Sequence, residues 1–349
     1  MTKFLVDILN EPDELLKSLA YTMGPGRSAL DEASALVRSA PRLYLTGIGS
    51  SWHAGLGIAT LLEAAGCAVC VIDTSEMLHF AETPPGSVVI AMSRSGRSTE
   101  IVQLVDKLRG RARIVAITNT PDSPLVRGAD ILLRMETAFD HMVSVTMYSA
   151  LCLVGGLLAR AVARSLNGAA ARALEQAIHA AKRALPAWQE CVANNGWFTA
   201  EAPVYFLARG TSLASCHEAR LLWEEAAKAP ATAMTVGGFR HGSQEMLREG
   251  MRIGLWLDPD HMRSEDLALA ADLRKLGVKV MFIGQDLPDG AADLALALPP
   301  VAQPWQFVID IIPAQLAAER QSHVRGVSCD DFRLCPYIVE DQGGLFAAG

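Results

Sequence analysis

Residues 87–100 read SVVIAMSRSGRSTE, and this stretch decides the fold of the first half of the chain. An apolar, strand-like run ends near Met92, a turn of serine, arginine and glycine follows, and a helix-forming segment comes next. Backbone N–H groups at the start of a helix attract anions, and serine hydroxyls in the turn add donors. The stretch therefore predicts a phosphate site. The alternative is that Ser95 or Ser98 only caps the helix.

Outward from this stretch, short apolar runs typical of strands alternate with helix-length segments. Because strand and helix alternate, we predict two tandem α/β units, each with a mainly parallel sheet flanked by helices. The expected strands are RLYLTG (42–47), AVCVID (68–73), SVVIAMS (87–93), ARIVAIT (112–118), DILLRM (130–135), PVYFLARGTS (203–212), MRIGLWLD (251–258), VKVMFIG (278–284) and DLALALP (293–299). In the second half, helices are expected over about 217–228, 264–276 and 305–323.

An alanine-rich segment, about 169–191, separates the two halves and predicts a linking helix. Each half opens with a strand that ends in glycine and small hydroxyl residues, TGIGSS in the first and ARGTS in the second. Ligands of such sheets bind at the carboxyl ends of the strands. The predicted organisation is an N-terminal helical segment (1–28), a first domain (29–168), a linker helix (169–196), a second domain (197–325) and a tail (326–349).

The composition favours a globular protein without a basic surface. Of the 349 residues, 50% are hydrophobic and 20% are charged, and the formal net charge is -7. Binding to nucleic acid or to anionic lipid relies on clustered Lys and Arg, so neither partner is expected. The apolar stretch 143–163 contains Ser144 and Arg160, which favours a buried helix over a membrane span.

The cysteines and the N-terminus predict a cytoplasmic protein. Seven cysteines are too few and too scattered for a disulfide framework. Cys67 and Cys70 form a CxxC in an apolar setting, which we interpret as part of a buried strand, and no second pair supplies further metal ligands. The first residues carry acids rather than the features of a signal peptide. We expect neither a metal nor a cofactor.

The serine-rich turn resembles the S-x-S-G-x-[ST] phosphate loop of sugar isomerase (SIS) domains, and residues 49–51 resemble the upstream G-[TS]-S element of that family. The resemblance extends over nearly the whole chain, and it implies tandem SIS domains of flavodoxin-like, three-layer architecture. It implies phosphate contacts from Ser51, Ser93, Arg94, Ser95 and Ser98. It also implies sugar contacts from Gly49, Ser50, Glu76, Val143 and Val145.

In the second half, FLARGTSLASCHEARLLWEEAAKAP resembles the family segment that carries an essential glutamate, at Glu225 here. Residues 238–242 resemble the family's G-x-x-K-H-G turn, with His241 at the catalytic histidine, and Glu218 matches a glutamate that contacts the sugar. A glutamate can move the proton between C1 and C2 of an open-chain sugar phosphate, and a histidine can open the ring or protonate a leaving amine. Without the resemblance, Glu225 and His241 would be interpreted as solvated surface residues.

The chain departs from the family pattern in ways that restrict the chemistry. Tyr337 occupies the position of a tail lysine that forms an imine in the synthases, and Leu222 that of another lysine. No glutaminase segment is expected before residue 1, so amide transfer from glutamine is not expected. The second half has GLWLDPDHM where a serine-rich turn would lie, so we expect one phosphosugar site per chain.

We therefore expect an enzyme that acts by C1/C2 proton transfer on an aminosugar or fructosamine phosphate. A deglycase accommodates Tyr337 best, because its substrate already carries nitrogen on C1, and an isomerase or a deaminase uses the same proton shift. The alternative is a non-catalytic sugar-phosphate-binding regulator. The resemblance also implies a homodimer in which His241 enters the neighbouring site.

Overall fold

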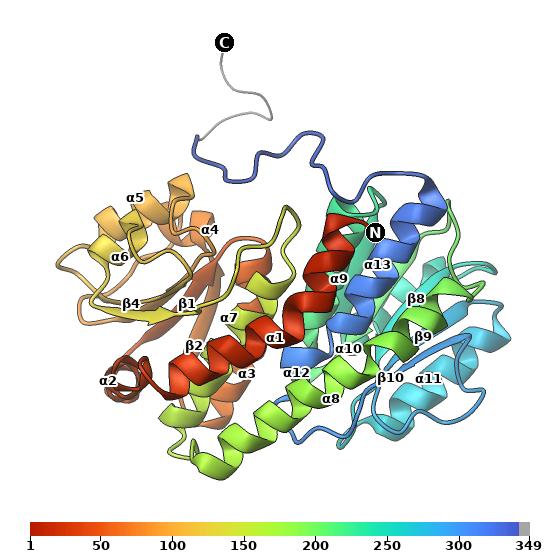
Figure 1. Cartoon of the computed structure of the whole chain (residues 1–349), viewed down its shortest axis with the longest axis horizontal. Coiled ribbons are helices and arrows are strands. Elements are labelled where there is room, and N and C mark those ends of the chain that lie inside the picture. Colours follow the sequence, from red (N-terminus) through yellow and green to blue (C-terminus); the bar gives the residue numbers. More distant parts are fainter. Residues whose placement is uncertain (342–349) are drawn as a thin grey trace. The chain divides into compact units, whose positions relative to one another are not determined.

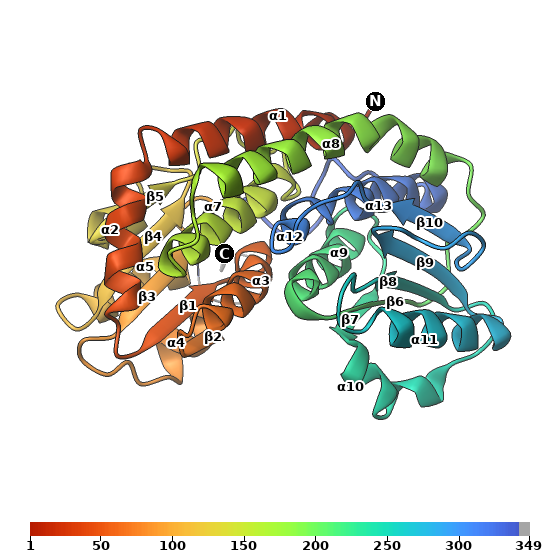
Figure 2. The same ribbon diagram turned by 90° about the horizontal axis from the view of Figure 1, so that it is seen from below.

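The computed structural model describes residues 1–341. The chain forms two compact units (Figures 1 and 2). The first unit consists of Asp13–Glu175 and the described residues from Phe332 on, and the second of Met1–Pro12 and Gln176–Asp331. Helices α1 (Lys3–Met23) and α8 (Gly168–Ala193) contribute to both units. We describe each unit by itself.

The first unit is built around a five-stranded parallel sheet in the order β2-β1-β3-β4-β5. Its strands are β1 (Leu43–Gly47), β2 (Val69–Asp73), β3 (Val88–Met92), β4 (Arg113–Thr118) and β5 (Ile131–Arg134). Its helices are α2 (Arg27–Arg38), α3 (Ser50–Ala64), α4 (Thr74–His79), α5 (Thr99–Leu108), α6 (Pro124–Gly128) and α7 (Thr146–Val162). The five predicted strands of this half are confirmed.

Helices cover both faces of this sheet, as the unbroken apolar runs of the central strands require. Helices α4, α5 and α6 pack on one face, where α5 buries Ile101, Leu104, Val105 and Leu108 at helical spacing (Figure 1). Of the remaining helices, α3 contacts β1, β2 and β3, α2 contacts β5, and α7 contacts β4. Helix α7 also contacts both α2 and α3. Helix α7 is buried along almost its whole length, which confirms the expected buried helix. Within residues 1–341, no helix is both long and apolar enough to cross a membrane.

The second unit contains a five-stranded parallel sheet in the order β10-β9-β8-β6-β7. Numbered along the chain within each unit, both sheets have the order 2-1-3-4-5, which is the flavodoxin-type order. The strands are β6 (Val204–Ala208), β7 (Ala231–Thr235), β8 (Arg252–Trp256), β9 (Lys279–Gly284) and β10 (Leu294–Ala297). The helices are η1 (Gly210–Ser212), α9 (Leu213–Glu225), α10 (Val236–Arg240), η2 (Ser243–Met246), α11 (Arg263–Lys275), α12 (Gln306–Ile309) and α13 (Ile312–Arg325). Figure 2 shows α11 and α9 on opposite faces of this sheet.

Three expectations from the sequence need correction. Strand β7 was not predicted, because ATAMT has no apolar run and forms an edge strand whose residues are only partly buried. The CxxC segment is not a buried strand, because β2 is also an edge strand and Cys70 is exposed. The closing helix is divided into α12 and α13, and Pro313 lies in the first turn of α13, where its missing N–H is tolerated.

Candidate functional site

The serine-rich turn of the first unit lies between the end of β3 and the start of α5. Ser93 Oγ accepts a hydrogen bond from the Gly96 backbone N–H (3.0 Å), and Ser95 Oγ accepts one from that of Arg97 (3.2 Å). Gly96 has φ +62°, and a Cβ at this position would lie 2.3 Å from Ser123 Oγ. Glycine is therefore required here for its backbone conformation and for space.

The serines of this turn do more than cap the helix. Ser98 is the N-cap residue of α5, yet its side chain makes no capping hydrogen bond. Ser93 and Ser95 are buried, and a hydroxyl oxygen that accepts from the backbone retains its own O–H for donation. The geometry thus leaves hydroxyl donors beside a helix N-terminus, which is the chemistry expected of an anion site.

The second turn of the candidate phosphate site follows β1. Strands β1 and β3 are neighbours, and the strand order reverses between them, so their carboxyl ends form the topological switch point. Gly49 has φ +56° and precedes α3, whose first two residues are Ser50 and Ser51. The Ser51 side chain is buried. The structure therefore brings the two predicted serine elements to adjacent strand ends.

The loop before α7 contains Val143 and Val145, both with buried side chains. The Asp140 carboxylate accepts hydrogen bonds from the backbone N–H groups of Val145 (2.9 Å), Thr146 (2.9 Å) and Met147 (3.0 Å). These contacts fix the start of α7, and they engage the N–H of Val145. Sequence reasoning missed Asp140, although an acid shortly before a helix start is a recognisable capping signal.

The C-terminal segment contacts the serine-rich turn within the same unit. The Arg94 guanidinium lies 4.0 Å from the centre of the Tyr337 ring and donates to the Tyr337 carbonyl oxygen. The Tyr337 hydroxyl donates to the Asp140 carbonyl oxygen (2.9 Å), and the Thr99 N–H donates to the carbonyl oxygen of Val339 (3.1 Å). Tyr337 thus lies next to the predicted phosphate residues, 243 positions after Arg94.

Glu76 lies on α4, which follows the edge strand β2, and its side chain is exposed. The N-cap of this short helix is Asp73, whose carboxylate accepts from the Ser75 N–H at 2.8 Å. Within residues 1–341, no hydrogen bond or ion pair joins Glu76 to the serine-rich turn. Its predicted role in sugar binding stays a prediction.

Helix α9 of the second unit carries Glu225, the predicted catalytic base, and Glu218, a predicted sugar-binding residue. Glu218 is buried and Glu225 is partly buried, and a separation of seven residues places both on one face of the helix, about 10 Å apart along its axis. Lys228, a non-glycine residue with φ +52°, donates to the carbonyl oxygens of Glu225 and of Asp331 (2.8 Å to the latter). Lys228 therefore ties the end of α9 to the last segment of this unit.

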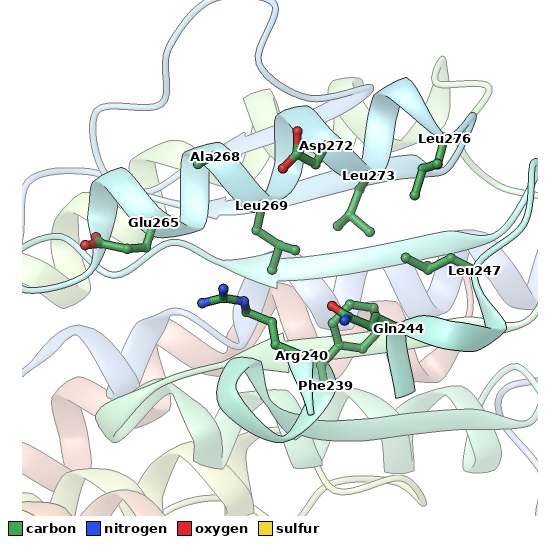
Figure 3. A pocket seen from close by; sticks show the side chains of 10 residues that line it. All are labelled: Phe239, Arg240, Gln244, Leu247, Glu265, Ala268, Leu269, Asp272, Leu273 and Leu276. Carbon is green, nitrogen blue, oxygen red and sulfur yellow. The ribbon is translucent and has the colours of Figure 1, made fainter. Parts of the chain in front are cut away.

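His241 lies at the C-terminal end of α10 and its side chain is exposed. The helix is capped by Thr235 Oγ1, which accepts from the Gly238 N–H at 2.9 Å. A cavity of about 330 Å³ between this segment and α11 is lined mainly by leucines and by Phe239, with Arg240, Glu265 and Asp272 at its edge (Figure 3). The residues that line the cavity include no serine or threonine, and the acids Glu265 and Asp272 would repel an anion, so we do not assign a phosphate to it.

The first turn of the second sheet also has a glycine with positive φ, but there a carboxylate of the chain binds the serine hydroxyls. Gly210 has φ +54°, close to that of Gly49, and Ser212 takes the place of Ser51. Ser212 Oγ donates to the Asp310 carboxylate at 2.7 Å, and Ser215 donates to its other oxygen. Complete burial raises the pKa of Asp310 to about 7, although hydrogen bonds from both serines lower it.

The turn after β8 also carries acids instead of serines. The Asp258 carboxylate accepts from the N–H groups of Asp260 (3.2 Å) and Met262 (3.0 Å). Buried Asp266 pairs with Arg209 at 2.8 Å, and burial raises the pKa of Asp266. Carboxylates of the chain thus occupy the donors at this second switch point, and such a turn is unsuited to a phosphate.

Comparison with known proteins finds a matching family model and related sequences. Residues 36–159 match the SIS domain family model. The chain is 23% identical over 331 residues to the glutamine--fructose-6-phosphate aminotransferase [isomerizing] of Sulfolobus acidocaldarius, covering 94% of this chain and 55% of that protein. The corresponding Bacillus subtilis protein is 25% identical over 317 residues, covering 86% and 51%. The chain therefore spans about half the length of these curated relatives.

Solved structures share the fold. The C-terminal domain of glucosamine-fructose-6-phosphate aminotransferase from Francisella tularensis superposes with a TM-score of 0.85 at 18% identity, covering 95% of this chain and 98% of that one. Tagatose-6-phosphate ketose/aldose isomerase from Escherichia coli gives 0.80 at 20% identity, covering 96% of each chain. Glucosamine-6-phosphate deaminase from Thermotoga maritima gives 0.78 at 19% identity, covering 97% and 99%.

The serine-rich turn, its helix and the parallel sheet of the first unit all lie within residues 36–159, so this part of the chain is an SIS domain. Within that class, the chain is homologous to the isomerase domain of glucosamine-fructose-6-phosphate aminotransferase. The predicted family resemblance is confirmed.

Proposed function

We propose that this protein is a phosphosugar enzyme that acts by proton transfer between C1 and C2 of an aminosugar or fructosamine phosphate. The observation that carries the proposal is the serine-rich turn at the switch point of the first sheet, where hydroxyls surround the N-terminus of α5. Ser51, Ser93, Ser95 and Ser98 hold the phosphate, and Arg94 adds a positive charge. The homologous aminotransferases and the isomerase and deaminase structures support a substrate of this class.

Glu225 is the proposed base and His241 the proposed acid. In a deglycase, Glu225 removes a proton from C1 of the fructosamine phosphate, which gives an enolamine. Protonation at C2 then produces a C1 imine, and water cleaves the C1–N bond to release the amine and an aldose phosphate. No lysine imine is needed, and Tyr337 at the position of the family lysine cannot form one. The same two residues can serve an isomerase or a deaminase.

Several features of the architecture belong to the same proposal. The matching strand orders and the matching glycines, Gly49 and Gly210, support two tandem SIS domains. For these domains we propose the boundaries expected from the sequence, 29–168 and 197–325. The exposed His241 side chain is compatible with a homodimer in which this histidine enters the neighbouring subunit's site. The proposed location of the protein is the cytoplasm. The proposed sugar-binding residues are Gly49, Ser50, Glu76, Val143, Val145, Glu218 and Tyr337.

Turnover of a substrate panel tests the proposal. The purified protein is incubated with fructosamine 6-phosphates of several amino acids, glucosamine 6-phosphate and fructose 6-phosphate, and free amine, ammonia and hexose phosphate are measured. Release of an amino acid with glucose 6-phosphate would establish a deglycase, and ammonia or interconversion would establish a deaminase or an isomerase. Tight binding of a sugar phosphate without turnover would instead indicate a regulatory binder. The absence of both binding and turnover would refute the proposal.

A further inference from the structure

The segment after Phe332 has no helix or strand within the described residues, yet two of its residues, Tyr337 and Val339, contact the serine-rich turn and the start of α5. Arg94 contacts the ring and the carbonyl oxygen of Tyr337, and it also donates to the Met142 carbonyl oxygen at 3.4 Å. Further along the segment, the Val339 carbonyl oxygen accepts from the Thr99 N–H. One side chain of the turn thus joins the tail to the loop before α7.

The Tyr337 hydroxyl adds a link of its own, because it donates to the Asp140 carbonyl oxygen. The Asp140 carboxylate in turn fixes the first N–H groups of α7. The phenol therefore connects the tail to a loop whose conformation is already fixed. The guanidinium stacked on the aromatic ring and the hydrogen bond of the phenol both stabilise the attachment of the tail.

We propose that residues 332–341 form a strap across the phosphate turn, and that Arg94 and Tyr337 are positioning residues that hold the strap in place. In this arrangement the Arg94 guanidinium acts through Tyr337, while the serine hydroxyls contact the phosphate directly. The fixed strap presents the face of Tyr337 to the sugar and makes the site selective for a sugar phosphate over inorganic phosphate. The selectivity rests on the proposed function, whereas the strap itself does not.

Hydrogen exchange in the ligand-free protein tests the strap. The Thr99 amide should be protected in the wild type, because the Val339 carbonyl accepts from it. Tyr337→Ala and Arg94→Ala should each accelerate its exchange about tenfold or more, since both remove the stacked pair. The Val102 amide, which donates to Ser98 within α5 (3.1 Å), should not change and reports that the helix is intact.

Matched variants separate the individual contacts. Arg97→Ala removes an exposed positive charge from the same turn and should leave the exchange of Thr99 unchanged. Arg94→Lys retains the charge without the planar, forked guanidinium and should resemble Arg94→Ala. Tyr337→Phe retains the ring and loses only the bond to Asp140, so its effect should be intermediate. Wild-type exchange of Thr99 in both Arg94→Ala and Tyr337→Ala would overturn the strap.

Ligand affinity tests the selectivity. In Tyr337→Ala, the Kd for fructose 6-phosphate should rise about tenfold, while the Kd for inorganic phosphate should change less than about twofold. In a turnover assay the same variant should raise KM more than it lowers kcat. Equal losses for both ligands, or tighter binding of either, would overturn the selectivity. A wild type that binds no sugar phosphate but protects Thr99 would refute the proposed function and leave the strap standing.

Discussion

At the scale of single residues, the serine-rich turn combines two uses of one side chain. The hydroxyl oxygens of Ser93 and Ser95 accept from the backbone of the turn, and their hydrogens remain for a ligand. The same hydroxyl groups thus stabilise the loop and, in the proposed function, bind the phosphate. Gly96 completes the turn because no other residue fits its conformation and its contact with Ser123.

Ser95→Ala should weaken binding of a sugar phosphate by about 1.5 to 3 kcal/mol, because the variant removes a hydrogen bond to a charged group. Titration calorimetry with fructose 6-phosphate measures the loss. Ser264→Ala, at an exposed serine of the second unit, is the control and should bind like the wild type. An unchanged Kd in Ser95→Ala would remove Ser95 from the phosphate site.

Glu225→Gln should reduce kcat by a factor on the order of a hundred or more with a nearly unchanged KM, because the amide cannot accept the proton. Steady-state kinetics on the substrate identified by the panel measures both constants. The neighbouring Glu224, which pairs with Arg220 on the same helix, offers a matched control. If Glu225→Gln were as active as Glu224→Gln, another residue would be the base.

At the scale of secondary-structure elements, the two sheets repeat one plan with different chemistry at the switch point. Both first turns begin with a glycine at φ near +55°, followed by hydroxyl residues. In the second unit, Ser212 of this turn and Ser215 of α9 bind Asp310, which lies between α12 and α13. A carboxylate of the chain thereby joins the start of α9 to the closing helices.

Asp310 should make the stability of the protein depend on pH. Its pKa is about 7 in the folded chain and 3.8 as an ordinary carboxyl, so the native state holds a proton that the unfolded state releases between these values. The contribution of this group is therefore complete below about pH 4 and is lost as the pH rises to 7. The loss is at most about 4 kcal/mol.

Asp310→Asn removes this titration, so its stability relative to the wild type should increase between pH 4.5 and 7.5. Urea unfolding of both proteins across this range measures the difference, in which the other carboxyls cancel. Asp293→Asn is the control. Burial raises the pKa of Asp293, but hydrogen bonds from Val280 and Lys279 lower it overall, so it titrates below this range. A difference that is constant with pH would contradict the assignment for Asp310.

At the scale of the whole molecule, the proposed dimer can be tested without a structure of its interface. If His241 acts in the neighbouring subunit's site, then a dimer of one Glu225→Gln chain and one His241→Asn chain contains one intact pair of catalytic groups. Co-expression of both variants should therefore restore about a quarter of the wild-type activity, since half of the dimers are mixed and each has one working site.

Activity of the co-expressed sample, measured beside each variant alone, gives the answer, and size-exclusion chromatography checks the dimer. Co-expression of Glu225→Gln with the double variant is the matched control, because no combination of these chains contains an intact pair. Activity no higher than that of the single variants would show that His241 does not act across the interface.

The sequence by itself determined the alternation of strands and helices, the family and the serine-rich turn. Each of these depends on local rules: continuous apolar runs for doubly covered strands, helical spacing of apolar residues, and small residues where the backbone must turn. The rule failed at β7, because an edge strand of alanine, threonine and methionine has no apolar run. The roles of Glu225 and His241 followed from resemblance, because nothing local distinguishes a solvated helix glutamate from a base.

Only the tertiary structure decided which distant residues meet. Asp140 and Tyr337 are 197 positions apart, and Ser212 and Asp310 are 98 apart, so no pattern along the chain links them. Such contacts depend on where the tail and the closing helices pack. Burial then raises the pKa of Asp310, because a carboxyl without water retains its proton. The packing of Arg94 against the Tyr337 ring holds a segment of the chain in place.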